Sequence, residues 1–394
     1  MRIVGTRAFG LRTPIVRDGD DLVAVVCQSV KDAIEHEKII INDGDIIGIT
    51  EAVLARSQGN YATLEQIAAD LQTQFPKDSH IGVIFPIMSR NRFAMLLKGI
   101  AMGVEKVTVQ LSYPADEVGN QLISLEDVDD KNLNPYSDCL SEEEYRRLFG
   151  HETKHRFTGV DYVAYYKSLG DNIEIILCED PKRILEHSKN IIAADIHTKS
   201  RTKRALYAAG AEKVISLDEL MTKPVNGSGY NELYGLLGSN KASEDRVKLF
   251  PRNCDVFVHK MQQALNDLSG KTLEVLVYGD GGFKDPVGGI WELADPVVAP
   301  AYTEGLAGTP NELKLKYLAD NDFADLPKDE ARKAIEQAIR EKAGRSQMGK
   351  MESEGTTPRQ LTDLLGSLCD LVSGSGDKGT PVVLIQGYFD NYAN

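Results

Sequence analysis

The chain has 394 residues and a formal net charge of −14, from 59 acidic and 45 basic side chains. The length is sufficient for two or three domains with large cores, and the acidic balance argues against a nucleic-acid or membrane-surface partner, because both are polyanions. We read no signal peptide in the first residues and no apolar run of the roughly 18 residues that a membrane span needs. The cysteines show no C-x-x-C spacing, so we expect a cytoplasmic protein without a disulfide framework.

Strands and helices alternate over the first 110 residues. A helix is predicted over 20–35, because apolar residues recur there every four positions, at Leu22, Val26, Val30 and Ile34. Thr63 and Gln66 form a capping-box pattern, which predicts the start of another helix. The remaining predicted elements here are strands within 43–50, 81–86 and 107–112, and a helix over 89–104 with Arg90 and Arg92 in its opening turn.

The pattern changes after an irregular polar stretch at 113–150. Residues 172–217 read as strand, helix, strand, helix, strand, and the helices are long enough to cross over between parallel strands. We therefore assign 151–225 to a small parallel α/β module of its own, followed by a glycine-rich linker at 225–232. The rest of the chain predicts helices within 254–268, 328–344 and 357–372 and strands at 273–278 and 381–387. The predicted fold class is α/β.

HETKH at 151–155 matches the His-Glu-x-x-His pattern of zinc metalloproteases, which need both histidines on one stable helix. A capping box at Ser141 and Glu144 starts a helix that Gly150 would end, so the motif follows a helix instead of lying inside one. We expect a solvated loop here and keep a metalloprotease as a lesser alternative. SGSGDKGTP at 373–381 imitates a phosphate loop, but Lys378 precedes its glycine and a strand follows, so we expect a turn.

The stretch LEVLVYGDGGFKDPVGG at 273–289 carries the most chemical information. An apolar strand leads directly to Asp280 in a glycine-rich loop that also contains Lys284 and Asp285. Carboxylates at a strand end, beside backbone that a ligand can approach, suit Mg²⁺ or Mn²⁺ with nucleotide phosphates. The alternative is a tight turn capped by the aspartate.

Four stretches together resemble the coenzyme F(420):L-glutamate ligase family, also called gamma-glutamyl ligase. They occur in the family's order, at 10–22, 43–59, 247–280 and 357–387. The resemblance implies an α+β core of the gamma-glutamyl ligase type over 1–150 and 226–394. The module at 151–225 has no counterpart and looks inserted.

The resemblance implies a cytoplasmic, homodimeric enzyme whose substrates are small molecules. It would use GTP and Mg²⁺ or Mn²⁺ to join L-glutamate to a carboxylate acceptor through an acyl-phosphate. The acceptor stays open between a deazaflavin, a folate-like pteridine and another acid, so a folate-type gamma-glutamyl ligase is one alternative. A nucleotide- or metabolite-binding protein of the same fold without turnover is the other.

The resemblance also implies roles for individual residues. Asp280 would hold a metal ion, and Lys284 lies about where an arginine follows that aspartate in the family. The family's other metal-binding aspartate is missing before Ser239 here, and Glu232, Glu244 or Asp285 could replace it. This loss motivates the alternative without turnover. The residues expected at the nucleotide are Leu11, Arg12, Thr13, Pro14, Ile15, Val16, Arg56, Ser239 and Asn240.

Overall fold

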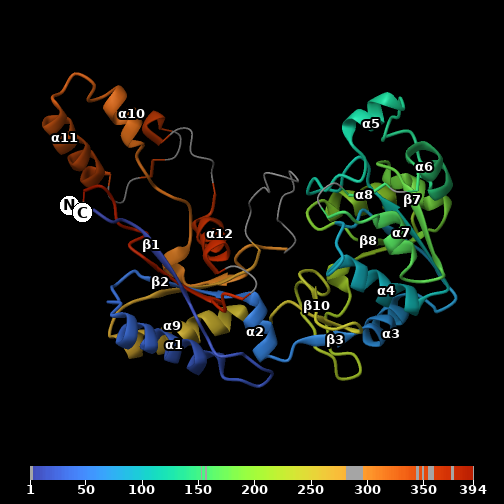
Figure 1. Ribbon diagram of the computed structural model, residues 1–394, viewed down its shortest axis with the longest axis horizontal. Helices are drawn as coiled ribbons and strands as arrows, with labels where there is room; N and C mark the ends of the chain where they lie inside the picture. The colour runs from blue at the N-terminus through green and yellow to red at the C-terminus, as the bar shows by residue number, and fades with distance from the viewer. Residues whose placement is uncertain are drawn as a thin grey trace.

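The chain folds into two lobes joined by a narrow neck (Figure 1). The computed structural model describes residues 3–151, 153–155, 158–280, 296–342, 346–347, 350–353, 359–373 and 377–393. The first lobe combines the amino-terminal and carboxyl-terminal parts of the chain, and the second lobe consists of the residues between them. Both chain ends lie on the first lobe near α11 (Lys328–Glu341) (Figure 1).

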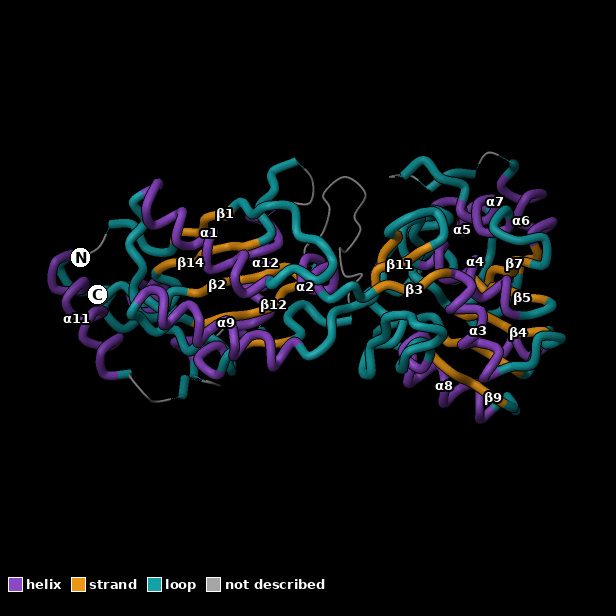
Figure 2. Tube along the Cα trace, turned by 90° about the horizontal axis from the view of Figure 1, so that it is seen from below, coloured by secondary structure: helices purple, strands orange, loops and turns teal. Residues whose placement is uncertain are grey.

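The first lobe is built, in the described part of the chain, on a five-stranded sheet in the order β1-β14-β2-β12-β13. The pair β2 and β12 is parallel, and the other neighbouring pairs are antiparallel. Figure 2 shows β1, β14, β2 and β12 side by side, with helices on both sides. The strands are β1 (Arg7–Leu11), β14 (Val382–Gln386), β2 (Ile46–Thr50), β12 (Glu274–Tyr278) and β13 (Ala301–Tyr302).

Helices cover both faces of this sheet, namely α1 (Leu22–Glu37) and α9 (Cys254–Ser269) on one face and α12 (Leu361–Ser373) on the other. Ile47 and Ile49 pack against α1 and α9, whereas Ile46 packs against α12. Because both faces of β2 are buried, the strand is apolar on both sides and does not alternate. Gly48 lets α12 approach, since a Cβ there would lie 2.4 Å from Cys369 Sγ.

The second lobe contains a six-stranded sheet, among the described residues, in the order β6-β7-β5-β4-β8-β9. The five strands from β7 to β9 are parallel, and the short edge strand β6 is antiparallel to β7. The strands are β4 (His80–Ile84), β5 (Lys106–Leu111), β6 (Leu140–Ser141), β7 (Ile173–Leu177), β8 (Asn190–Ala193) and β9 (Lys213–Ser216).

This second sheet is doubly wound. The chain runs outward from β4 to β5 and β7 on one side, then returns to β8 and β9 on the other. One face packs with residues of α3 (Leu64–Gln74), α4 (Phe93–Gly103) and α7 (Tyr162–Lys167). The opposite face packs with the 3-10 helix η1 (Pro181–Glu186) and α8 (Lys199–Ala208). Open parallel sheets of this kind bind ligands outside the carboxyl ends of their strands.

The structure divides the chain differently from the expected module at 151–225. The strands β7, β8 and β9 of that segment continue the sheet formed by β4 and β5, which lie before residue 150. The neck is a three-stranded sheet of β10 (Asn240–Lys241), β11 (Arg246–Lys248) and β3 (Tyr61–Thr63), where the chain enters and leaves the second lobe. The parallel unit therefore extends from about α3 to the residues before β10.

Several local predictions are confirmed. The capping boxes at Thr63–Gln66 and Ser141–Glu144 start α3 and α6 (Glu142–Phe149), and Gly150 ends α6 with a φ of 83°. The helix predicted over 89–104 begins later, at Phe93. None of the helices in the described ranges is long and apolar enough to cross a bilayer. The remaining helices are α2 (Glu51–Ser57), α5 (Leu125–Asp130), α10 (Leu315–Asp320) and the 3-10 helices η2 (Leu217–Glu219), η3 (Glu304–Leu306) and η4 (Met351–Ser353).

Candidate functional site

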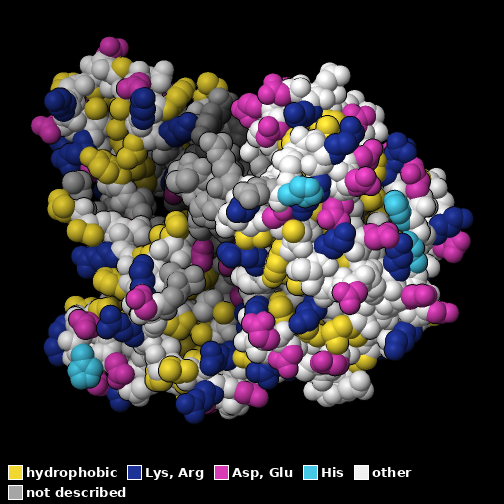
Figure 3. Space-filling model, turned by 45° about the vertical axis from the view of Figure 1, so that its right-hand side comes forward, with side chains coloured by type: hydrophobic (Ala, Val, Ile, Leu, Met, Phe, Trp, Pro, Cys, Tyr) yellow, Lys and Arg dark blue, Asp and Glu magenta, His cyan; other side chains and the backbone are white. Residues whose placement is uncertain are grey.

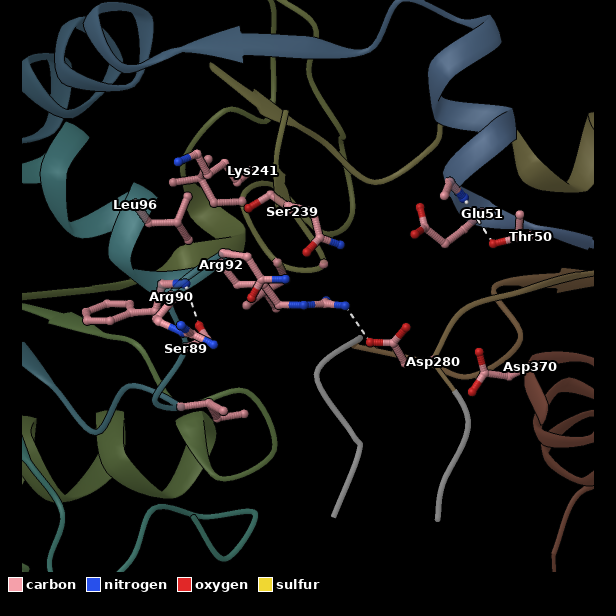
Figure 4. Close-up of a pocket in the computed structure, with 18 of the residues that line it drawn as sticks. Thr50, Glu51, Ser89, Arg90, Arg92, Leu96, Ser239, Lys241, Asp280 and Asp370 are labelled. Atoms are coloured by element: carbon pink, nitrogen blue, oxygen red, sulfur yellow. Dashed lines mark hydrogen bonds and ion pairs between the residues drawn. The ribbon is translucent and has the colours of Figure 1, made fainter. Parts of the chain in front are cut away.

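A cleft of about 1270 Å³ lies between the two lobes. This exceeds the roughly 300–1,000 Å³ of a pocket for one drug-sized ligand, so more than one substrate fits. The first-lobe wall consists of 13–16, 50–53, Arg56, Asp280 and residues between 370 and 381. The second-lobe wall is formed mainly by 87–93 and 236–241. Figure 4 shows labelled residues of both walls facing each other.

Asp280 reaches the cleft because β12 ends just before it. The strand residues Val275–Tyr278 are at most 1% exposed, and the Gly279 N–H donates to the Val298 carbonyl oxygen at 2.8 Å. The Asp280 carboxylate forms an ion pair with the Arg92 guanidinium, which extends from the start of α4 in the second lobe (Figure 4). The side chains of Arg92 and Asp280 are 16% and 37% exposed. An ion pair between two side chains thus connects the walls of the cleft.

Two further acidic side chains line the same wall as Asp280. Glu51 is the first residue of α2, and its carboxylate accepts hydrogen bonds from Lys248 Nζ at 2.9 and 2.8 Å in a buried ion pair. Asp370 comes from α12, and Figure 4 draws Glu51, Asp280 and Asp370 on one side of the cleft. The sequence had not singled out Glu51 or Asp370, although both lie in stretches that carry the family resemblance, at 43–59 and 357–387.

The carboxylates of the cleft wall limit how a divalent cation could be bound. The described residues hold no group of three or more side chains arranged to bind a metal ion. Mg²⁺, however, is commonly bound by one or two carboxylates together with substrate phosphates and water. Asp280, with Asp370 on the same wall, offers that type of donor. A cation held partly by a nucleotide therefore fits this cleft, whereas a cage made only of protein side chains does not.

The described lining of the cleft combines acidic and basic side chains. Beside the three carboxylates it contains Arg56, Arg90, Arg92 and Lys241, of which Arg92 and Lys241 form ion pairs. Outside the cleft, acidic and basic side chains are mixed over the surface. Figure 3 shows this for the face of the second lobe that is turned forward. The basic groups of the cleft favour small anionic substrates, because their attraction is confined to the cleft.

Most of the residues expected at the nucleotide lie in the cleft. Two main-chain hydrogen bonds hold the first-lobe wall together. The Thr13 N–H, in the loop after β1, donates to the Gly379 oxygen in the turn before β14 (3.3 Å). The Thr50 N–H, at the end of β2, donates to the Pro381 oxygen in the same turn (3.0 Å). Leu11 and Arg12 do not line the cleft, since Leu11 is buried in the core and Arg12 is exposed elsewhere. The expected residues that do line it are Thr13, Pro14, Ile15, Val16, Arg56, Ser239 and Asn240.

Neither described candidate for the missing metal ligand lines the cleft. The third candidate, Asp285, lies outside the described residues, as does Lys284, which was expected where the family has an arginine. Glu232 is exposed and does not line the cleft. Glu244 also lies outside the lining and pairs with Lys241.

Asp116 fixes the loops of the second-lobe wall. Its carboxylate accepts hydrogen bonds from the main-chain N–H of Met88 (2.9 Å), Val118 (3.2 Å) and Asn120 (2.9 Å), and from the Asn120 side-chain amide (2.7 Å). Burial raises the pKa of Asp116 to about 6. The loops that follow β4 and β5 are therefore held together by one buried carboxylate.

Ser239 contributes a buried hydroxyl group to the cleft. The residue is 3% exposed, and its Oγ has no hydrogen-bond partner among the described residues. A buried hydroxyl without a partner costs about 1–3 kcal/mol of desolvation. A ligand that hydrogen-bonds to Ser239 Oγ would remove this cost.

The described residues of the HETKH segment belong to no cluster of three metal-ligating side chains. His151 is exposed, and Glu152 lies outside the described residues. The expectation of a solvated loop is wrong for His155, which is 4% exposed and packs edge-on against Tyr162 with ring centroids 5.7 Å apart. His155 Nδ1 accepts a hydrogen bond from the Thr158 N–H at 3.1 Å, and burial lowers the pKa of His155. The imidazole is a core group that was missed because its neighbours in sequence are polar.

Comparisons with known proteins support the earlier resemblance. The model of the family described as F420-0:Gamma-glutamyl ligase matches residues 10–387, which is nearly the whole chain. The matched range includes both lobes and every described residue of the cleft wall. A comparison with curated proteins finds no match.

Proposed function

This chain belongs to the F420-0:gamma-glutamyl ligase family, a family of acid–amino-acid ligases, and we propose that it uses GTP to join L-glutamate to a carboxylate acceptor through an acyl-phosphate. The observation that carries the proposal is the cleft in which Asp280 lies among Arg56, Arg90 and Arg92. A carboxylate for a cation and several guanidinium groups for oxyanions are the groups that phosphoryl transfer needs.

The first step would transfer a phosphoryl group to the acceptor. An acceptor carboxylate oxygen attacks the γ-phosphorus of the nucleotide, the bond to the β-phosphate oxygen breaks, and the nucleoside diphosphate leaves. A Mg²⁺ or Mn²⁺ ion, when bound, would neutralise charge on the phosphate oxygens. Asp280 would hold that ion from the first-lobe wall, and Arg56 would contact the nucleotide phosphates. The two walls would bring the acceptor and the nucleotide together and limit the access of water.

The second step would form the amide. The neutral amine of L-glutamate attacks the acyl carbon, the bond between that carbon and the phosphate oxygen breaks, and inorganic phosphate leaves and takes up the proton that the nitrogen loses. Arg92, which pairs with Asp280 in the cleft, would stabilise the departing oxyanion. Activation is required because an amide does not form from a free carboxylate and an ammonium group in water.

An omission assay tests this function. Phosphate release should require nucleotide, Mn²⁺, an acceptor and L-glutamate together, with F420-0 as the first acceptor and a folate-type acid as the second. GTP and ATP are compared in parallel, because the choice between them is part of the proposal. Phosphate release that does not depend on any acceptor would contradict the ligase assignment.

The alternative function is a nucleotide- or metabolite-binding protein without turnover. The absence of the family's second metal-binding aspartate before Ser239 motivates it. Tight binding of GTP with Mn²⁺, without phosphate release for any acceptor, would establish this alternative. We also propose a cytoplasmic homodimer, for which sedimentation analysis is the direct test of assembly.

A further inference from the structure

The cleft lies at the point where the strand order of the second sheet reverses. The order reverses at β4, so the carboxyl ends of β4 and β8 lie next to each other with their loops leading apart. The loop after β4 supplies residues 87–92 to the cleft, and the loop after β8 supplies Ala194 and Ile196. Residues that follow β5 and β9 line it as well, namely Val118, Asn120 and Leu217. In doubly wound sheets this crevice is where ligands bind.

The side chains of this crevice combine an apolar surface with groups that bind oxyanions. The apolar surface contains two tyrosines and several aliphatic side chains. Arg90 is exposed beside it, and Ser239 Oγ lacks a partner among the described residues. The apolar and aromatic side chains that line it are Phe93, Tyr162, Tyr165, Ile196, Leu217 and Leu236.

We infer that the second lobe binds the acceptor, as an organic acid with an apolar body of ring size and an oxyanion directed at Arg90 and Ser239. This inference rests on the proposed ligase function. The nucleotide is assigned to the opposite wall, where Arg56, the loop after β1 and Asp280 lie. Ser239, which the family resemblance places at the nucleotide, is thereby reassigned to the acceptor. The acceptor then approaches the γ-phosphate from the other wall, which is the arrangement that transfer between them requires.

The crevice is held rigidly enough to select a ligand. Asp116 fixes the loops after β4 and β5 through its hydrogen bonds to Met88, Val118 and Asn120. Tyr166 is fully buried and fixes Ser89, accepting from the Ser89 N–H at 2.8 Å and donating to its carbonyl oxygen at 3.2 Å. Preorganisation of this kind reduces the entropy cost of binding.

The test measures binding to the full-length protein by calorimetry, with F420-0 alone, GTP with Mn²⁺ alone and inorganic phosphate alone. Arg90→Gln removes the charge at the crevice, and Ser239→Ala removes the hydroxyl group. The matched control is Arg204→Gln, an exposed arginine on α8 of the same lobe that does not line the cleft. Arg90→Gln should weaken F420-0 binding about 10- to 100-fold, as expected for the loss of a charge-assisted hydrogen bond, and should leave GTP binding within about twofold.

Each outcome has a definite meaning. Weaker F420-0 binding in both crevice variants, with the control unchanged, supports the inference. A loss confined to GTP would place the nucleotide at Arg90 and overturn it, and so would equal F420-0 affinity in all variants. An effect on inorganic phosphate alone would overturn the acceptor assignment and leave a simple anion site. Because binding needs no turnover, F420-0 binding without phosphate release would contradict the proposed function and leave this inference standing.

A second observation, independent of the cleft, concerns Cys139 and Cys178. The register of β6 and β7 pairs Leu140 with Leu177, so the next residues along the same register are Cys139 and Cys178. The Cys178 N–H donates to the Leu111 oxygen, and its carbonyl oxygen accepts from the Gln110 side chain. The main-chain polar groups of Cys178 therefore face away from β6, which makes the two cysteines a non-hydrogen-bonded pair.

This geometry suits a disulfide. Residues at non-hydrogen-bonded antiparallel positions have Cα atoms about 4.5 Å apart, within the range of about 4.4–6.8 Å that disulfides span. The two thiols already hydrogen-bond to each other, which lowers the pKa of Cys178 and raises that of Cys139. Cys139 is partly exposed, whereas Cys178 is buried.

We propose that Cys139 and Cys178 form a reversible disulfide when a peroxide oxidises the protein. The accessible Cys139 thiol first passes its proton to the Cys178 thiolate beside it, and the Cys139 thiolate then attacks the peroxide, becoming a sulfenic acid and releasing hydroxide. The hydroxide takes the proton from Cys178 to form water, the Cys178 thiolate attacks the Cys139 sulfur, the S–O bond breaks, and the hydroxyl group leaves as a second water once it is protonated by solvent. Two thiols and one peroxide thus give one disulfide and two waters.

Thiol counting with peptide mapping tests this proposal. Peroxide should reduce the five free thiols of the native full-length protein by two, both at Cys139 and Cys178, and a thiol reductant should restore them. Cys178→Ser should instead leave Cys139 as a sulfenic acid, and Cys27, which is also partly exposed, serves as the internal control. Oxidation first at Cys27, or a disulfide between two chains, would overturn the proposal.

Discussion

Arg92 and Asp280 are 188 positions apart in the sequence and form an ion pair across the cleft. Arg92 lies at the start of α4 in the second lobe, and Asp280 follows β12 in the first lobe. The Arg92 guanidinium therefore pairs with the same Asp280 carboxylate that we propose as the ligand of a divalent cation. A cation and Arg92 would compete for the same negative charge.

Arg92→Gln should consequently tighten Mn²⁺ binding to the nucleotide-free protein. Partly exposed ion pairs are worth about 0.2–1 kcal/mol, so the dissociation constant should fall by at most about fivefold. Isothermal titration with MnCl₂ measures it, with Arg204→Gln as the control. Weaker Mn²⁺ binding in Arg92→Gln would contradict the competition.

Asp280→Asn should lower the rate of nucleotide-dependent phosphate release about 100- to 1000-fold. The variant keeps the size of the side chain but removes the charge that would hold the cation, and the loss of one such electrostatic partner typically costs about 2.7–4 kcal/mol of transition-state stabilisation. The assay titrates Mn²⁺ for the wild type, Asp280→Asn and the exposed control Asp320→Asn. Wild-type turnover with an unchanged Mn²⁺ requirement would make Asp280 a turn residue only.

Arg56→Glu should weaken nucleotide binding, because it places a negative charge beside the phosphates. Arg12→Glu is a sharp control, since the sequence assigned Arg12 to the nucleotide but the structure places it outside the cleft lining. Calorimetry with GTP and Mn²⁺ should show a loss for Arg56→Glu and none for Arg12→Glu. The reverse result would move the nucleotide away from the cleft.

Lys248→Met should destabilise the fold strongly. Lys248 and Glu51 form a buried ion pair with side chains 11% and 6% exposed, and removal of one partner leaves an uncompensated charge. Such losses cost about 3–5 kcal/mol, whereas replacement of both partners by apolar residues is often neutral. Urea unfolding of Lys248→Met and of the double variant Glu51→Leu/Lys248→Met tests this. An equal loss in both variants would contradict an energetic role for the buried charge.

The elements that the sequence predicted correctly are those set by short-range signals. The capping box at Thr63 and Gln66 and the apolar run of β2 depend on neighbouring residues, and both were read correctly. The extent of the second lobe was not predicted, because the pairing of β4 with β8 joins residues more than a hundred positions apart. A boundary drawn from composition cannot detect that a later strand completes an earlier sheet.

In the candidate site, too, residues marked by their sequence neighbours were predicted, whereas those that depend on distant contacts were not. Asp280 was found because a strand and a glycine-rich loop adjoin it in the sequence. Arg92 was noticed only as part of a helix start, and its partner across the cleft depends on the placement of two lobes. The burial and pairing of Glu51 could not be predicted, because its partner Lys248 belongs to the distant strand β11.

The last prediction concerns His155 and pH. Burial lowers the pKa of His155 below the ordinary value of 6.5, so the folded protein binds a proton there less readily than the unfolded chain. The unfolded chain therefore holds more protons at this position as the pH falls below about 6.5, and the free energy of unfolding must decrease. Above that pH the imidazole is neutral in both states and has no effect.

His155→Phe keeps a ring against Tyr162 and removes the titrating group, so its stability should decline less than that of the wild type between pH 7 and pH 5. His151→Ala is the control, because His151 is exposed. The measurement is the free energy of unfolding from urea titrations at several pH values. The same pH dependence in the wild type and His155→Phe would show that the folded protein protonates His155 as readily as the unfolded chain does. That result would contradict the buried, neutral imidazole that accepts a hydrogen bond from the Thr158 N–H.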